Sequence, residues 1–357
     1  MKTLRRIAMI STSLAIIAAA ACAQTATAKK PKVVIVATGG TIAGSASSNT
    51  SAGYQSGAVG VDVLINAVPQ LKEIADVSGE QIASIGSQDM NDEVWLKLAK
   101  RVNAILAKPD VSGVAITHGT DTMEETSYFL SLVVKSDKPV VLTGSMRPST
   151  AMSADGPLNI YNAVAIAADP MARGRGVMVT VDDDIHAAHD IVKAHTTDVG
   201  TMGSGEMGLL GATLFGKQTW FRSPATVFGR KSEFSVDNVN KLPRVDIIYA
   251  HANMSPDIIT SAVQNGAKGL VIAGVGDGNM TSQAAEAVKA VCAKGIVVVR
   301  SSRTNGGIIR RNIEVNDDQA GTVASMELNP GKARVLLQLA LMKTSDPKTI
   351  QGYFDRY

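Results

Sequence analysis

Cysteine is almost missing from this chain, which has 2 cysteines among 357 residues. Cys22 lies in an N-terminal segment that we expect to be removed, so Cys292 would stand alone and no intramolecular disulfide can form. Aromatic residues are also scarce, at 4%, so valine, isoleucine, leucine and alanine must fill the core. Because 45% of the residues are hydrophobic, the composition predicts a globular protein rather than a disordered one.

An excess of charge of one sign is missing as well. Residues 1–28 combine a basic start (Lys2, Arg5, Arg6) with an apolar run and small-residue cleavage sites, which is typical of a secretory signal peptide. The run is too short and too interrupted to favour a membrane span. Its removal leaves 35 − 3 = 32 basic against 32 acidic residues, a neutral mature chain. This balance does not favour nucleic acid or an anionic membrane as a partner. A lipid anchor on Cys22 is the alternative to cleavage.

Residues 33–44 (VVIVATGGTIAG) are the stretch around which the rest is organised. A continuous apolar run bounded by glycine is typical of a parallel strand buried on both faces. Gly39 and Gly40 carry no Cβ, so the backbone can turn sharply and approach a ligand closely. Thr41 follows the strand at its carboxyl end, where open α/β sheets bind their ligands. A tight turn without chemistry is the alternative for this stretch.

Apolar runs and helical patterns alternate along the rest of the chain. The capping-box pattern of Thr122 and Glu125 predicts a helix from Met123. This alternation predicts an α/β fold: a doubly wound, mostly parallel sheet in a large N-terminal domain, with a second, smaller α/β domain. The predicted strands end near 85, 117, 143 and 181, and helices are expected over 61–74 and 91–106. The expected order is a signal peptide (1–28), an N-terminal catalytic domain (29–222), a linker (223–244) and a C-terminal domain (245–357).

Several cofactor and metal motifs fail on inspection. The stretch 211–218 (GATLFGKQ) lacks the hydroxyl after Lys217 and the following helix of a phosphate-binding loop. In GVGDGN, Asn279 stands where a dinucleotide fingerprint needs its last glycine. The polar stretch with His186, His189, Asp190 and His195 contains no HExxH, and the chain has no GxSxG elbow. We therefore expect neither a metal nor a cofactor.

Small hydroxyl, amide and acid groups follow the ends of several predicted strands. These groups are Thr41, the pair Ser87 and Gln88, and the pair Thr120 and Asp121. Because the carboxyl ends of parallel strands meet at one edge of a sheet, the groups could line one pocket.

A threonine hydroxyl is a weak nucleophile until a neighbouring group takes its proton. No histidine is obviously placed for this, so the candidates are the phenol of Tyr54, in the Ser- and Gly-rich loop 45–60, and the amine of Lys193. Each has a plainer interpretation: Tyr54 as a loop anchor and Lys193 as a solvated charge.

Long motifs resemble those of the bacterial periplasmic type II L-asparaginases, and the related glutaminase-asparaginases share most of them. The motifs are ATGGTIAG, GSQDMND, ITHGTDTMEET, PVVLTGSMRPSTAMSADGP, VKAHTTD and KARVLLQLAL, and they cover nearly the whole mature chain. The resemblance implies a periplasmic homotetramer without a cofactor, whose sites are completed across a subunit interface.

The resemblance also implies residue roles. Thr41 would be the nucleophile on the side-chain amide, assisted by Tyr54 from a mobile lid. Thr120, Asp121 and Lys193 would form a second group, in which Lys193 keeps a threonine deprotonatable. Which of the two threonines attacks first stays open.

Substrate contacts follow from the same resemblance. Ser87 and Gln88 would hold the α-carboxylate, and Asp121 and Glu314 the α-amino group. Glu314 would come from a neighbouring subunit, and Asn253 would support the site from the second domain.

The predicted function is an exported amidohydrolase that converts L-asparagine, and more slowly L-glutamine, to the acid and ammonia through a threonine acyl-enzyme. A glutaminase-asparaginase of broad specificity is one alternative. A periplasmic amino-acid binding protein is the other, since it also has paired α/β domains but needs no Lys193 beside a threonine.

Overall fold

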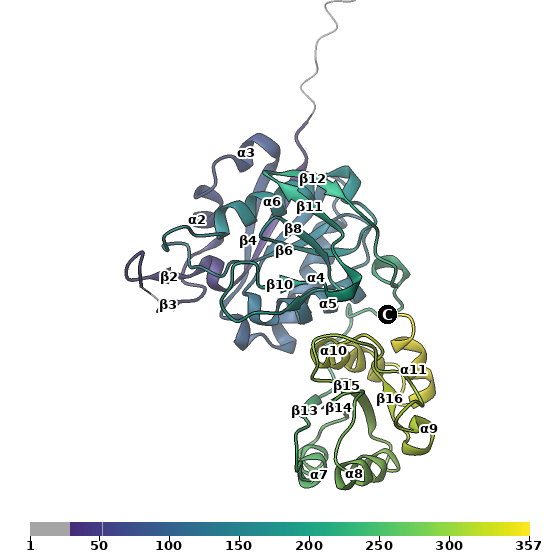
Figure 1. The fold of residues 1–357 in the computed structure, drawn as a ribbon. Helices are drawn as coiled ribbons and strands as arrows, with labels where there is room; N and C mark the ends of the chain where they lie inside the picture. The colour runs from purple at the N-terminus through teal and green to yellow at the C-terminus, as the bar shows by residue number, and fades with distance from the viewer. Residues whose placement is uncertain (1–28, 52) are drawn as a thin grey trace, which may run out of the picture. The chain divides into compact units, whose positions relative to one another are not determined.

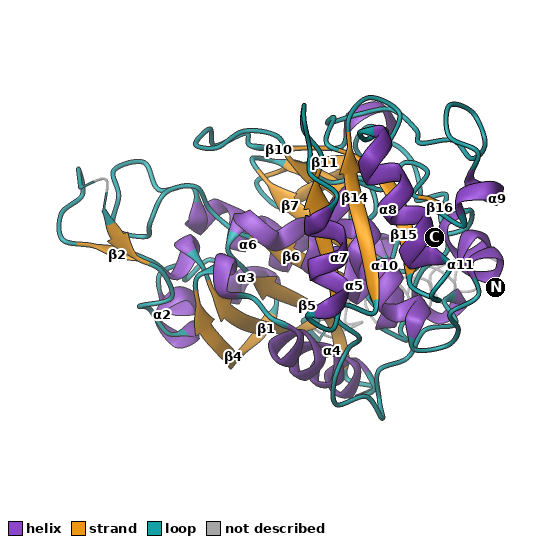
Figure 2. Cartoon of the chain, turned by 90° about the horizontal axis from the view of Figure 1, so that it is seen from below, coloured by secondary structure: helices purple, strands orange, loops and turns teal. Residues whose placement is uncertain are grey.

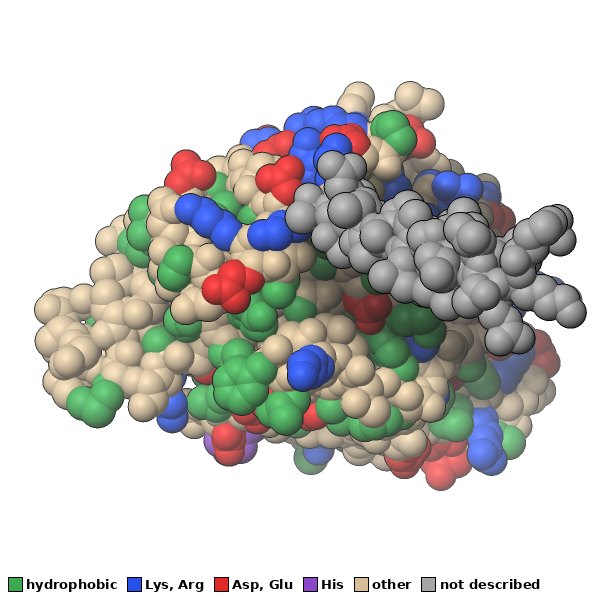
Figure 3. Space-filling view, turned by 90° about the horizontal axis from the view of Figure 1, so that it is seen from above, with side chains coloured by type: hydrophobic (Ala, Val, Ile, Leu, Met, Phe, Trp, Pro, Cys, Tyr) green, Lys and Arg blue, Asp and Glu red, His purple; other side chains and the backbone are tan. Residues whose placement is uncertain are grey.

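The structure, a computed structural model, describes residues 29–51 and 53–357. The expected signal peptide with Cys22 lies outside the described residues. Residues 31–357 form one unit (Figure 1). Within the described residues, no helix is long and apolar enough to cross a membrane. On the face drawn in Figure 3, basic and acidic side chains are interspersed, in keeping with the balanced charge.

Eight strands of the described chain form the larger sheet, in the order β12-β11-β8-β7-β6-β5-β1-β4. Five of them pair in parallel, and β8, β11 and β12 add an antiparallel edge. The parallel strands are β1 (Lys32–Gly39), β4 (Asp76–Ile85), β5 (Val111–Thr117), β6 (Val140–Thr143) and β7 (Val177–Val181). The antiparallel ones are β8 (Asp184–Ala187), β11 (Gly211–Leu214) and β12 (Lys217–Trp220). The predicted α/β class with a mostly parallel sheet is confirmed.

Helices cover both faces of this sheet, and β1 shows why. Val33 and Ile35 pack into one buried cluster, whereas Val34 and Val36 pack into another, because successive strand residues point to opposite faces. One face carries α2 (Val61–Asn66), α3 (Leu71–Ile74) and α6 (Gly156–Ala168); the other carries α4 (Asp92–Leu106) and α5 (Met123–Val133) (Figure 2).

The smaller sheet is parallel throughout, in the order β13-β14-β15-β16. One of its helices, α10, packs against both this sheet and α5, so Phe129, Leu336 and Val299 belong to one continuous core. The strands are β13 (Val245–Tyr249), β14 (Gly269–Gly274), β15 (Val297–Ser302) and β16 (Val323–Ala324). Helices α7 (Asp257–Gln264) and α8 (Ser282–Cys292) cover one face, and α10 (Pro330–Leu341) and α11 (Pro347–Phe354) the other; α9 (Asp317–Ala320) lies between β15 and β16 in sequence.

Local structure differs from the prediction at two helices. The expected helix over 61–74 is two short helices, α2 and α3, because Pro69 disfavours helical geometry at the residue before it. The expected capping box at α5 does not form. Thr122 makes no side-chain cap and instead donates its hydroxyl to the carbonyl of Ser87 at 2.8 Å.

Short strands form in the predicted loop 45–60 and in the stretch rejected as a phosphate-binding loop. Within the predicted loop 45–60, β2 (Ser45–Ala46) pairs with β3 (Tyr54–Gln55). The rejected phosphate-loop match is the β11–β12 hairpin, whose two-residue turn has φ of 46° and 76° at Phe215 and Gly216. Other short elements are β9 (Val192–Lys193), β10 (Met202–Gly203), η4 (Pro170–Ala172), η5 (Gly205–Met207) and η6 (Gly229–Lys231).

Candidate active site

Three adjacent strands, β4, β1 and β5, each end in a short 3-10 turn. The backbones of two of these turns touch. A Cβ on Gly40, whose φ is 84°, would lie 2.3 Å from the amide nitrogen of Gly119. Only glycine therefore allows this approach of the β1 and β5 ends. The turns are η1 (Thr41–Ala43), η2 (Ser87–Asp89) and η3 (Thr120–Thr122).

Ser87 ties the β4 end to the β5 end. Its carbonyl accepts the Thr122 hydroxyl at 2.8 Å, and its Oγ accepts the amide N–H of Asp121 at 3.2 Å. Ser87 is buried, whereas its neighbour Gln88 is exposed and donates to Asp89 at 3.3 Å. The structure therefore brings the predicted groups of all three strand ends together at one edge of the sheet.

Tyr54 reaches Thr41 from the β2–β3 hairpin. The two hydroxyl oxygens are 2.7 Å apart, a hydrogen bond in which either can donate. Thr41 is 9% exposed and Tyr54 41% exposed, so the pair lies at the surface end of a buried strand. Gly44 makes room for the phenol: a Cβ there would lie 2.9 Å from the Tyr54 ring.

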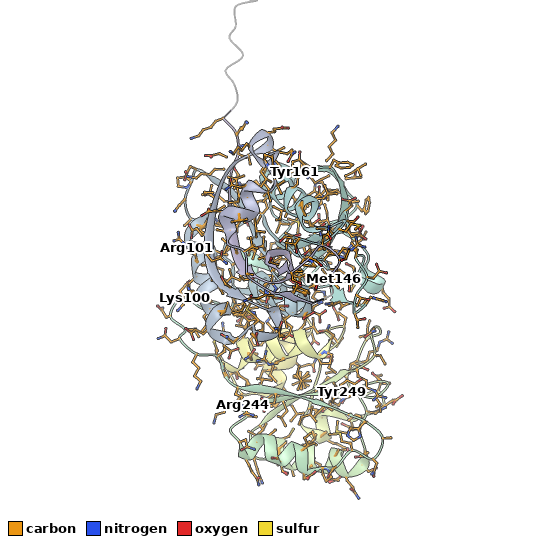
Figure 4. All side chains as sticks on the ribbon, turned by 90° about the vertical axis from the view of Figure 1, so that its left-hand side faces the viewer. Lys100, Arg101, Met146, Tyr161, Arg244 and Tyr249 are labelled. Carbon is orange, nitrogen blue, oxygen red and sulfur yellow. The ribbon has the colours of Figure 1, made fainter. Side chains whose placement is uncertain are left out.

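Lys193 meets Thr120 and Asp121 in a second cluster. Its Nζ donates to Thr120 Oγ1 at 3.0 Å and to Asp121 Oδ1 at 2.5 Å. The Thr120 hydroxyl in turn donates to the sulfur of Met146 at 3.3 Å (Met146 is labelled in Figure 4). The Lys193 side chain is 17% exposed and that of Asp121 is 57% exposed. An amine within hydrogen-bond reach of a threonine hydroxyl can exchange a proton with it.

His118 is the buried neighbour of this cluster. Its Nδ1 lies 2.6 Å from the carbonyl oxygen of Gly119, and burial lowers its pKa to about 4. The imidazole is therefore neutral at pH 7. Within the described residues neither ring nitrogen bonds to a threonine hydroxyl.

The groups predicted from the second domain are not brought to this edge within one chain. Glu314 is exposed and accepts a hydrogen bond from the Nδ2 of Asn279. Asn253, with φ of 60°, lines a groove with Arg244 and Tyr249, both labelled in Figure 4. Among the residues that the structure describes, no hydrogen bond or ion pair joins Glu314 or Asn253 to the turns η1–η3.

Asn279 received no functional role in the sequence analysis. The side chain of Asn279 donates a hydrogen bond to Glu314, whereas the side chain of Asn253 does not bond to Glu314. A signal was present in the sequence: Asn279 ends the glycine-rich turn after β14, at the position where a dinucleotide fingerprint has its last glycine. An amide in place of a glycine adds a polar side chain at a strand end, which can serve recognition.

The other histidines take part in hydrogen bonds away from the two threonines. His186 Nδ1 lies 2.8 Å from Ser204 Oγ, and His189 Nδ1 lies 2.7 Å from Asp190 Oδ1. His195 Nδ1 accepts backbone N–H groups at 3.0 and 3.2 Å. In residues 29–51 and 53–357, no cluster of three histidine, cysteine or acidic side chains suited to a metal is found.

Two family matches cover most of the chain. Residues 32–226 match the family described as "Asparaginase, N-terminal", and residues 244–354 match "Glutaminase/Asparaginase C-terminal domain". The chain therefore belongs to the asparaginase/glutaminase family, and the resemblance identified from its motifs is confirmed.

Curated relatives and solved structures carry related names. The chain is 50% identical over 327 residues to "Probable L-asparaginase periplasmic" of Haemophilus influenzae, covering 92% of this chain and 93% of that protein. It is 47% identical to "Glutaminase-asparaginase" of Acinetobacter glutaminasificans, covering 92% and 100%. The crystal structure of "Probable Cytoplasmic L-asparaginase from Campylobacter jejuni" matches with a TM-score of 0.89 and 46% identity, covering 92% of this chain and 100% of that one.

Proposed function

We propose that this protein hydrolyses the side-chain amide of L-asparagine to L-aspartate and ammonia, and acts more slowly on L-glutamine. The observation that carries the proposal is the pair of threonine hydroxyls on adjacent strand ends, each hydrogen-bonded to a group that can exchange its proton: Thr41 with Tyr54, and Thr120 with Lys193. Membership of the asparaginase/glutaminase family supports the same substrate class.

In the proposed reaction, Thr41 Oγ1 attacks the amide carbonyl carbon and passes its proton to the Tyr54 hydroxyl, which gives up its own proton to the amide nitrogen. The C–N bond breaks with its electron pair on nitrogen, which leaves with this proton as ammonia. The resulting acyl ester of Thr41 is attacked by water, whose proton returns the threonine to its hydroxyl form. Lys193, paired with Asp121, lies beside Thr120, where it can transfer the proton released when water attacks the ester.

The α-carboxylate and the α-amino group of the substrate each need polar side chains to bind them. We assign Ser87 and Gln88 to the α-carboxylate and Asp121 to the α-amino group. A positive amino group taken out of water needs more than one carboxylate nearby. Glu314 of a neighbouring subunit, held by Asn279, is our second carboxylate, because it is exposed and, within the described chain, makes no hydrogen bond to η1–η3. This assignment requires an oligomer, for which we propose the homotetramer. Asn279 is here assigned the supporting role first given to Asn253.

Mixed oligomers test the shared site. Thr41→Ala and Glu314→Ala homomers should each be nearly inactive. Unfolded together and refolded, some sites would combine an intact Thr41 with an intact Glu314 from another chain, so ammonia release should reappear well above that of either parent. Mixed oligomers as inactive as both parents would place the whole site within one chain.

We further propose export to the periplasm with removal of residues 1–28, and a division into a catalytic domain (29–222), a linker (223–244) and a C-terminal domain (245–357). The two family matches leave 227–243 between them, which supports the linker. The periplasmic name of a relative supports export. The mass and N-terminal sequence of the protein recovered from a periplasmic extract test the cleavage.

Ammonia release tests the activity. The purified protein is mixed with L-asparagine and, in parallel, with L-glutamine, and ammonia is measured over time. Release from asparagine is expected, with a smaller kcat/KM for glutamine. Tight binding of asparagine without ammonia would indicate an amino-acid binding protein instead.

A further inference from the structure

Glu124 connects the start of α10 to the segment that carries Lys193. Asn329, at the N-cap of α10, donates its Nδ2 to Glu124 Oε1 at 2.8 Å. The other carboxylate oxygen, Oε2, accepts the backbone N–H of Lys193 at 2.7 Å. One carboxylate therefore joins a helix of the smaller sheet to the main chain of the lysine beside Thr120.

Few other contacts hold the main chain of Lys193 in place. Its strand, β9, is two residues long and pairs with β10 in a separate two-stranded sheet; the eight-stranded sheet reaches the segment through Ala187, whose carbonyl accepts the amide of Ile191 at 3.1 Å. A further link from α10 lies four residues earlier: Lys332 Nζ, buried at 2% exposure, donates to the carbonyl of His189 at 2.6 Å. The segment 189–193 is thus fixed at both ends by contacts that involve α10.

We propose that Glu124 and Asn329 are positioning residues that hold Lys193 against Thr120 and Asp121, so that α10 sets the activity of the strand-end site. The inference rests on the proposed role of Lys193. Within the described residues, no bond joins the Glu124 carboxylate to the Lys193 Nζ or to either threonine hydroxyl. Glu124 therefore acts on the reaction through the main chain of Lys193. A shift of 1 Å at a catalytic group costs about 10²-fold in rate.

Two variants remove the connection from opposite ends. Glu124→Ala removes both hydrogen bonds. Asn329→Ser keeps a hydroxyl cap for α10, which serine provides well, but is too short to reach Glu124. We expect kcat to fall by about 10²-fold in Glu124→Ala and by less in Asn329→Ser. Because neither residue is assigned to substrate binding, KM should stay near the wild-type value, so kcat and kcat/KM fall together.

A matched cap exchange controls for helix stability. Asp346 caps α11 by accepting the Thr349 N–H at 2.8 Å and makes no contact with Lys193 or Glu124. Asp346→Ser should change Tm about as much as Asn329→Ser while leaving kcat at the wild-type value. Equal losses of kcat in the two variants, or wild-type kcat in both Glu124→Ala and Asn329→Ser, would overturn the inference.

A double-variant cycle with Lys193→Met separates positioning from general damage. If Glu124 acts through Lys193, Glu124→Ala should cause no further loss in the Lys193→Met background. A loss of the same factor in both backgrounds would overturn the inference but leave the proposed function intact. Wild-type activity in Lys193→Met would instead overturn the role of Lys193, and the inference with it. Should Glu124→Ala not fold, Glu124→Gln, which keeps one acceptor, enters the same cycle with a smaller expected loss.

Discussion

Parallel strands of both sheets end in hydroxyl side chains, but the hydroxyls have different partners. At the carboxyl edge of the larger sheet, Thr41 bonds to Tyr54 and Thr120 to Lys193. At the edge of the smaller sheet, Ser301 donates to the carbonyl of Leu328 at 2.8 Å. Ser302 likewise donates to the carbonyl of Gly276 at 2.7 Å. Ser302 also shares a hydrogen bond of 2.8 Å with the Thr304 hydroxyl. Within the described residues, neither serine bonds to an amine or a phenol, whereas Thr120 bonds to an amine and Thr41 to a phenol.

The ion pairs of the two sheets also differ, in how far they are exposed to solvent. Lys193 and Asp121 form a partly exposed pair beside Thr120. In the smaller sheet, Arg300 and Asp317 are fully buried, with bonds of 2.7 and 2.8 Å. Burial alone would raise the pKa of the Asp317 carboxyl, but the bonds from Arg300 and Thr322 outweigh it and lower the pKa. The Lys193–Asp121 pair is open to solvent on one side, and the Arg300–Asp317 pair is closed.

Removing hydroxyls at the two edges should give the largest contrast. Thr41→Ala and Thr120→Val should each fold and lose turnover by orders of magnitude, because a nucleophile or its activation is lost. Ser302→Ala, which removes a hydroxyl with a backbone partner, should keep most of the activity. Retention of more than about a tenth of the wild-type kcat, a loss of only ~1.4 kcal/mol, would show that the threonine concerned has another role.

Removal of the buried ion pair of the smaller sheet should change the free energy of unfolding rather than the reaction rate. Asp317→Ala leaves Arg300 as an uncompensated buried charge and should lower the free energy of unfolding by about 3–5 kcal/mol. The matched control is Asp246→Ala, which breaks the partly exposed pair with Arg244 and should lower the free energy of unfolding far less. Urea unfolding followed by circular dichroism measures both. Equal effects would contradict the assignment of the Arg300 pair as structural.

Acid should weaken the larger sheet through two buried histidines. Burial lowers the pKa of His118 and of His186 from 6.5 to about 4. Their folded pKa values lie below the unfolded ones, so the unfolded chain binds protons first as pH falls. Stability present above pH 6.5 should be lost between pH 6.5 and 4, by at most about 3 kcal/mol for each histidine.

The chain's tryptophans report on this acid effect. Trp95 lies in α4 and Trp220 in β12, so fluorescence during urea unfolding follows the larger sheet. His186→Asn should remove its share of the pH dependence between pH 6.5 and 4. An unchanged slope in that variant would mean that His186 is not the group that binds the proton.

Substrate length should give the smallest effect. If the α-groups of the amino acid are held by Ser87, Gln88 and Asp121 on one side and Glu314 on the other, the reach to Thr41 is fixed. Asparagine should then exceed glutamine in kcat/KM, since one methylene changes such a ratio by about 10–200-fold. Equal values for the two amides would instead match the relatives named glutaminase-asparaginase.

The strand ends could be predicted because their signal is local. An apolar run followed by glycine and a hydroxyl specifies both β1 and the place of Thr41, and neighbouring parallel strands bring Ser87 and Thr120 alongside. Pro69 also marks the break between α2 and α3 in the sequence, although the helical pattern around it was given more weight.

Longer-range competition could not be predicted in the same way. Thr122 has the sequence of a helix cap, but the carbonyl of Ser87, 35 residues away, takes its hydroxyl. The partner of Glu314 depends on which strand end lies beside it, which spacing along the chain does not reveal. Asn279 was set aside because its turn was compared with a nucleotide-binding pattern rather than considered as a source of side chains.

The position of α10 between the two sheets has a consequence for biosynthesis. Helix α5 leaves the ribosome some 200 residues before α10 (Met123–Val133 against Pro330–Leu341), and until then its outer face has nothing to bury it. The half of the chain that forms the larger sheet therefore cannot complete its hydrophobic core during translation, unlike domains that fold one after another as they emerge. A chain that stays incompletely folded until its last helices are made remains in the form that a translocation channel can thread.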